Sequence, residues 1–131
     1  MRTLASRSAT REFLMALAAI SGALLLPVAA AEPALITEAR RALSEQIPQA
    51  AIVKLQAALA DATLGDADRL NAGVLLAEAQ LHGGRANDAI ETLSILNIPA
   101  DTHARQLRAL ALSSLGRWSE ALALFRELNA T

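Results

Sequence analysis

The sequence contains no cysteine and no tyrosine, and only 2% of its 131 residues are aromatic. Without cysteine the chain can form no disulfide bond, no thiolate metal site and no thiol nucleophile. So few aromatic side chains also provide no platform on which nucleic-acid bases could stack. These absences leave a core that must be built from aliphatic side chains.

Residues that favour strands are scarce as well, whereas alanine and leucine, which favour helices, are abundant. With 53% hydrophobic residues, the composition predicts one small all-α domain. The net charge is only −1, so no basic excess is present to neutralise phosphate groups. We therefore expect no binding of nucleic acid.

The segment from residue 1 to residue 31 is typical of an export signal peptide. Three arginines form a basic start, residues 13–26 are an uncharged apolar run, and Ala29 and Ala31 match a cleavage site before Glu32. A cut before Ala31 is the alternative. The apolar run is shorter than the roughly 20 residues of a membrane-spanning helix. We expect a periplasmic or secreted protein, attached to a membrane only if the signal stays uncleaved.

Residues 32–131 then form the predicted mature domain. Proline, glycine and short polar side chains divide it into six expected helices, paired as hairpins at about 33–62, 67–97 and 101–130. Short turns force the two helices of each pair to pack antiparallel. Gly84 and Gly116 stand where a helix end favours the left-handed backbone conformation. Asp66 is an expected helix cap, and either Asp101 or Thr102 is expected to cap the fifth helix.

The second and third hairpins repeat one another at a single constant offset in the sequence. The matched pairs are Gly84 and Gly116, Arg85 and Arg117, Asp88 and Glu120, Ala89 and Ala121, and Leu93 and Phe125. The alanines are small enough to let the paired helices approach closely, and the residue four positions later lies on the same helix face. The two acids lie in a first helical turn, near the positive end of the helix dipole.

The segments GGRANDAIETL, at residues 83–93, and LGRWSEALALF, at residues 115–125, resemble the second half of the tetratricopeptide repeat. The likeness covers about residues 70–129. It is faint in the first hairpin, where the offset from Ala51 to Ala89 is longer than the one from Ala89 to Ala121, and Pro48 stands in the turn. The resemblance implies a solenoid of about three helical hairpins.

The resemblance also implies a concave groove, lined by the first helix of each hairpin, that holds a protein or peptide partner. The groove positions carried over to this chain are Asn71, Val74, Glu78, His103, Gln106 and Leu110. A carboxylate clamp of the kind found in this family would need basic residues at Val74 and Glu78, so that ligand is not expected.

The last expected helix carries apolar side chains that one neighbouring helix cannot all bury. They are Leu122, Leu124, Phe125 and Leu128. A repeat array exposes such a face unless a capping helix covers it. We expect self-association or a second protein at this edge, or a chain that is the front of a longer array.

No pattern of residues indicates catalysis. His82 and His103 have no carboxylate or thiol at a metal-ligand spacing, and no catalytic or phosphate-binding motif occurs. We expect no enzymatic activity, no metal and no cofactor. The leading hypothesis is an exported noncatalytic adaptor for other proteins, and the alternative is a structural or assembly subunit of an envelope complex.

Overall fold

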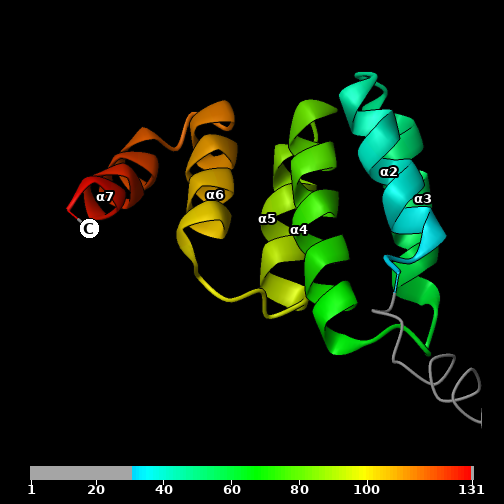
Figure 1. Cartoon of the computed structure of the whole chain (residues 1–131). Coiled ribbons are helices and arrows are strands. Elements are labelled where there is room, and N and C mark those ends of the chain that lie inside the picture. Colours follow the sequence, from blue (N-terminus) through cyan, green and yellow to red (C-terminus); the bar gives the residue numbers. More distant parts are fainter. Residues whose placement is uncertain (1–30, 131) are drawn as a thin grey trace, which may run out of the picture. The chain divides into compact units, whose positions relative to one another are not determined.

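The computed structural model describes residues 31–130. The predicted signal peptide lies outside these residues, except for Ala31. The described part contains six helices and no strand, which confirms the all-α prediction. They are α2 (Ala34–Ser44), α3 (Pro48–Ala60), α4 (Asp66–His82), α5 (Ala86–Ile95), α6 (Thr102–Ser114) and α7 (Trp118–Asn129), and they belong to one compact unit (Figure 1).

The helices pack as a row of hairpins. The pairs α2 and α3, α4 and α5, and α6 and α7 lie against each other, and each hairpin packs on the next through α3 with α4 and α5 with α6. The first helices also touch, α2 with α4 and α4 with α6, whereas among the described helices no contact joins α3 to α5 or α5 to α7. The row therefore curves toward its first helices, as in tetratricopeptide-like arrays.

Alanine occupies the helix crossings. Ala39, Ala77 and Ala109, one in each first helix, are completely buried. Ala51, Ala89 and Ala121 hold the matching place in the second helices, at 0%, 0% and 2% exposure. Larger side chains, such as Leu55 and Leu93, fill the space one turn further along. The packing predicted for Ala89 and Ala121 is confirmed.

Within residues 31–130, four helix ends use the same turn. The residue after each helix cap has a positive φ, at Gln46 (58°), Gly84 (75°), Asn97 (48°) and Gly116 (74°). Paired backbone hydrogen bonds close each end, for example from Gly84 N to Leu81 O and from Arg85 N to Gln80 O. The left-handed conformation predicted for the two glycines is confirmed.

Two details of the predicted caps and breaks differ. Pro48 begins α3 instead of separating two helices, because the first helical position needs no backbone N–H. Gly65 holds the cap position of α4 and Asp66 is its first helical residue, so Asp66 does not cap the helix through its side chain. Asp101 does cap α6, accepting a hydrogen bond from Ala104 N at 2.8 Å.

Gly73 of α4 lies against the connection between α5 and α6. A Cβ atom added to Gly73 would lie 2.8 Å from Leu96 Cδ1 and 2.9 Å from Ile98 Cδ1. Both atoms are the ends of side chains in the connection between α5 and α6, which would have to shift to admit a larger residue. The connection packs directly on α4.

The alanine crossings can be tested by enlarging one of them. Ala51→Leu should lower the free energy of unfolding by about 1–3 kcal/mol, because the extra methylenes overpack a closed contact. Ala57→Leu is the matched control, since Ala57 is exposed on the same helix and its enlargement should change stability little. Urea unfolding followed by circular dichroism measures both, and equal midpoints would contradict the packing role of Ala51.

Candidate protein-binding surface

The predicted groove residues of α4 lie along a half-buried stripe in the middle part of the helix. Asn71, Val74 and Glu78 are half-buried, while seven of the residues between and around them are buried. Their spacing of three and four residues places them on one face of the helix. The middle part of α4 thus reaches solvent along this stripe, while most of its other residues there are buried.

The predicted groove residues of α6 occupy the equivalent places. His103, Gln106 and Leu110 are exposed, and Leu110 keeps 47% of its surface in solvent. Each follows its counterpart in α4 by the same offset that relates Gly84 to Gly116. Since α4 and α6 are in contact, the two stripes lie side by side, and we call them together the first-helix face.

Arg40 extends this face onto α2, which the sequence analysis missed. Its Nη2 donates to Asn71 Oδ1 at 2.9 Å, and its Nε donates to Glu32 Oε1 at 3.0 Å. Asn71 Nδ2 donates to the same Glu32 oxygen at 3.2 Å. The longer offset that relates Ala51 to Ala89 also relates Arg40 to Glu78, so extending it into the first helix would have found Arg40.

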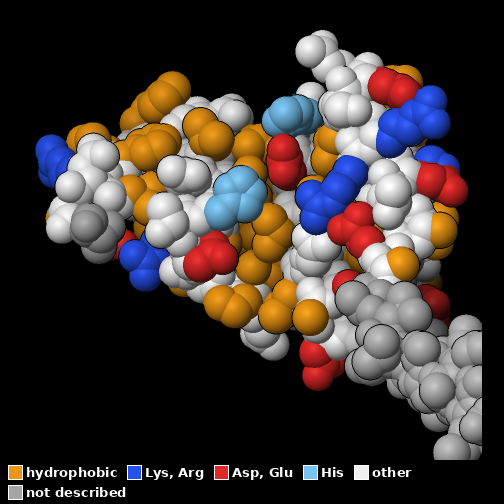
Figure 2. Space-filling view, viewed as in Figure 1, with side chains coloured by type: hydrophobic (Ala, Val, Ile, Leu, Met, Phe, Trp, Pro, Cys, Tyr) orange, Lys and Arg blue, Asp and Glu red, His pale blue; other side chains and the backbone are white. Residues whose placement is uncertain are grey.

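The surface of the array is mixed in character. Figure 2 shows basic, acidic and histidine side chains on one face, with hydrophobic side chains between them. Such a surface suits a partner segment that has both apolar and polar side chains better than it suits a uniformly charged ligand.

The Glu32 carboxylate is held as an anion by its neighbours. The hydrogen bond from Arg40 lowers the pKa of Glu32 below its ordinary value, with further lowering by Thr37 and Asn71 and an opposing effect of burial. Thr37 Oγ1 donates to Glu32 Oε2 at 3.1 Å. The network joins the segment before α2 to α4 on the first-helix face.

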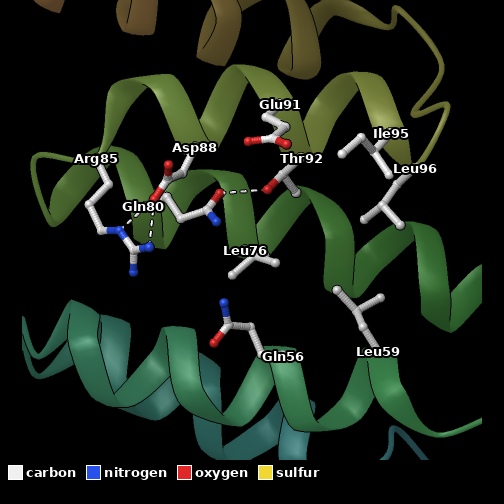
Figure 3. A pocket seen from close by; sticks show the side chains of 10 residues that line it. All are labelled: Gln56, Leu59, Leu76, Gln80, Arg85, Asp88, Glu91, Thr92, Ile95 and Leu96. Atoms are coloured by element: carbon white, nitrogen blue, oxygen red, sulfur yellow. Dashed lines mark hydrogen bonds and ion pairs between the residues drawn. The ribbon is translucent and has the colours of Figure 1, made fainter.

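A hollow lies over α4 on the side of the second helices. It has a volume of about 370 Å³ and exists because α3 and α5 do not touch. Figure 3 shows Gln56 and Leu59 of α3 across this hollow from Ile95 and Leu96, with Leu76 at its base. The sequence does not predict this hollow, since no local pattern reveals a gap between two helices.

Polar contacts close one end of this hollow. Gln80 is only 4% exposed, and its Oε1 accepts a hydrogen bond from Thr92 at 2.8 Å. Arg85 pairs with Asp88 at 2.6 Å, and the repeat-equivalent Arg117 pairs with Glu120 at 2.7 Å. The acids predicted to face the helix dipole therefore also bind the arginine at the helix cap.

The predicted edge residues of α7 differ in exposure. Leu122 has 48% of its surface exposed, whereas Leu124, Phe125 and Leu128 are half-buried. Trp118, on the same helix, is 68% exposed. Large apolar side chains on α7 thus reach solvent.

The two histidines lie apart from any metal-binding cluster in the described part. His82 ends α4 and His103 lies on α6, and residues 31–130 contain no group of three His, Cys, Asp or Glu side chains that could hold a metal ion. Within the same residues, none of the helices has both the length and the apolar character needed to cross a membrane. The absence of enzymatic activity stays a prediction.

Comparison with known families identifies the class of this chain. The family model described as the bacterial transcriptional activator domain matches residues 61–131, more than half of the chain. The chain belongs to this family. The matched range covers α4–α7 and leaves out α2 and α3. No curated protein and no solved structure was matched.

The tetratricopeptide prediction is therefore confirmed only at its coarser level. The chain is a tetratricopeptide-like array of helical hairpins, and the family that it belongs to is the bacterial transcriptional activator domain.

The Glu32 network predicts a pH-dependent stability. Because the folded pKa of Glu32 is lowered, its stabilising effect is present above the ordinary value of 4.5 and is lost as pH falls through the folded pKa. Glu32→Gln should destabilise the chain at neutral pH by less than about 1 kcal/mol, the range of exposed ion pairs. Urea unfolding of both proteins measures the difference, which should shrink below pH 4.5; a difference that is unchanged in acid would contradict the network.

Proposed function

We propose that this chain is a noncatalytic protein-binding module of the tetratricopeptide type, which holds a segment of a partner along the first-helix face. The proposal rests on the repetition of solvent-facing positions on adjacent helices. Arg40 of α2, Glu78 of α4 and Leu110 of α6 occupy equivalent positions in the three hairpins. Equivalent side chains in successive hairpins offer regularly spaced contacts to an extended or helical segment.

Two further features support this proposal. Gln106 and Leu110 are exposed without being needed for the core, so they are free to contribute to an interface. The half-buried Val74 and Glu78 belong to a helix with seven buried residues, and a rigid surface loses little entropy on binding. The expected partner is a protein or peptide, and binding of nucleic acid is not part of the proposal.

Site-specific photo-cross-linking tests the first-helix face. A photoreactive residue at His103, which is exposed, should capture a defined partner in the producing cell. The same residue at Val53, which is 66% exposed on α3, is the control and should not capture it. Glu78→Arg should reduce capture from His103 by tenfold or more while leaving the melting temperature unchanged. Equal capture from Val53 and His103 would contradict the assignment of the face.

We also propose that the chain acts after export, in the periplasm or outside the cell. The support is the basic start, the apolar run and the small-residue pattern of residues 1–31. An adaptor and a permanently assembled subunit of an envelope complex both agree with this location. Constant stoichiometry on purification would favour the subunit.

A second candidate function is a regulatory module inside the cell, because the family that matches residues 61–131 takes its description from transcriptional activators. The two candidates predict different locations. Fractionation of cells that produce a C-terminally tagged chain, followed by mass measurement, distinguishes them. We expect an exported product that begins at Glu32 or Ala31; an uncut chain in the cytoplasm would support the second candidate.

A further inference from the structure

The outer face of α7 carries large apolar side chains that no described helix covers. Trp118 is 68% exposed, Leu122 is 48% exposed and Phe125 is half-buried. Their spacing of four and three residues places them along one side of the helix. Among residues 31–130, α7 packs only against α6. We call Trp118, Leu122 and Phe125 the open face of α7.

The same positions are covered in the two preceding hairpins. Ile52 and Leu55 of α3 correspond to Leu122 and Phe125, and they are only 3% and 0% exposed. In α5 the corresponding residues are Ile90, which is half-buried, and Leu93, which is 2% exposed. The difference arises because α4 packs on α3 and α6 packs on α5.

The two covering helices share one sequence pattern. α4 contributes Ala72, Leu75 and Ala79 to the core that contains Leu55, and α6 contributes Ala104, Leu107 and Ala111 to the core that contains Leu93. Both sets have the spacing Ala-x-x-Leu-x-x-x-Ala. The small residues let the helix approach closely, and the leucine packs beside the large residues of the covered helix.

The corresponding positions of α2 carry no leucine, and two of the three are polar. They are occupied by Ala34, Thr37 and Arg41, and all three are exposed. Arg41 Nε donates to Glu45 Oε1 at 2.9 Å, and this pair would have to be desolvated if α2 of a second molecule covered α7. Head-to-tail stacking of two copies through α2 is therefore disfavoured.

The α7 helix of a second copy would match the open face less well than a helix like α4 or α6. Such a pair would set Trp118, Leu122 and Phe125 against a second set of large side chains, without the small residues that both covered helices meet.

We propose that the open face of α7 is a second binding surface, which takes an amphipathic helix of another protein bearing the pattern Ala-x-x-Leu-x-x-x-Ala. The partner helix would continue the array by packing on α7 as α6 packs on α5. This surface is separate from the first-helix face of the proposed function, and either can exist without the other.

The chain itself supplies the probe. A fluorescent peptide of residues 98–115 contains α6 with its Ala-x-x-Leu-x-x-x-Ala pattern and its Asp101 cap. Fluorescence anisotropy should show that it binds the full chain. The affinity should fall tenfold or more for Leu122→Asp in the protein and for Leu107→Asp in the peptide. Leu122 is half exposed, so Leu122→Asp should keep its helix content in circular dichroism.

A grafted chain controls for exchange of the peptide with the chain's own α6. Asn129 is the repeat equivalent of Asn97, so residues 98–115 can be joined directly after Asn129, where they should fold onto α7. The graft should bind the free peptide at least tenfold more weakly than the original chain. Equal binding to the graft would mean exchange of α6 and would overturn the proposal.

Further variants separate this surface from others. Val53→Asp changes an exposed residue of α3, and Glu78→Arg changes the first-helix face; neither should alter peptide affinity. Light scattering should show that the chain does not form a dimer through α7. Absence of peptide binding, an effect of Val53→Asp equal to that of Leu122→Asp, or a dimer dissolved by Leu122→Asp would each overturn the proposal.

Discussion

The close approach of helices at buried alanines is the constraint on which the rest of this structure depends. Ala39, Ala77 and Ala109 in the first helices, and Ala51 and Ala89 in the second, have no exposed surface. A helix that carries alanine at its crossing leaves no room for an aromatic ring there, which agrees with an aromatic content of 2%. Close packing of this kind also requires turns that reverse the chain within a few residues, and these are the left-handed turns at Gln46, Gly84 and Gly116.

The sequence predicted the later hairpins well because every packing requirement there has a local signal. Gly84 and Gly116 mark the turns, and the constant offset between the second and third hairpins marks the crossings. The first hairpin was harder to recognise. It forms the same turn with Gln46 in place of glycine, and its offset is larger because α3 and α4 are three and four residues longer than α5 and α6. A longer helix preserves the crossing but shifts the sequence spacing, so a fixed-period search loses it.

Surface features that depend on two hairpins at once could be predicted only in part. The solvent-facing stripes of α4 and α6 follow from repeat position, and the six predicted groove residues lie on them. The hydrogen bond from Arg40 to Asn71 joins residues far apart in the sequence, and it depends on how α2 packs against α4. The hollow lined by Gln56 and Ile95 depends on α3 and α5 not touching. Neither the contact of Arg40 with Asn71 nor the separation of α3 from α5 is encoded in one helix. The periodicity of the sequence therefore did not predict them.

The two ends of the described array are chemically unlike, and this difference gives it a direction. At one end α2 presents Thr37 and Arg41 where later first helices bury leucine and alanine, so water can solvate that face without loss. At the other end α7 presents Leu122, whose counterpart Ile52 is 3% exposed. A surface that is polar at one end and apolar at the other favours addition of a helix at α7 alone. The family match to residues 61–131 includes α7 and omits α2. The polar face of α2 therefore lies outside the matched range, whereas the open face of α7 lies inside it.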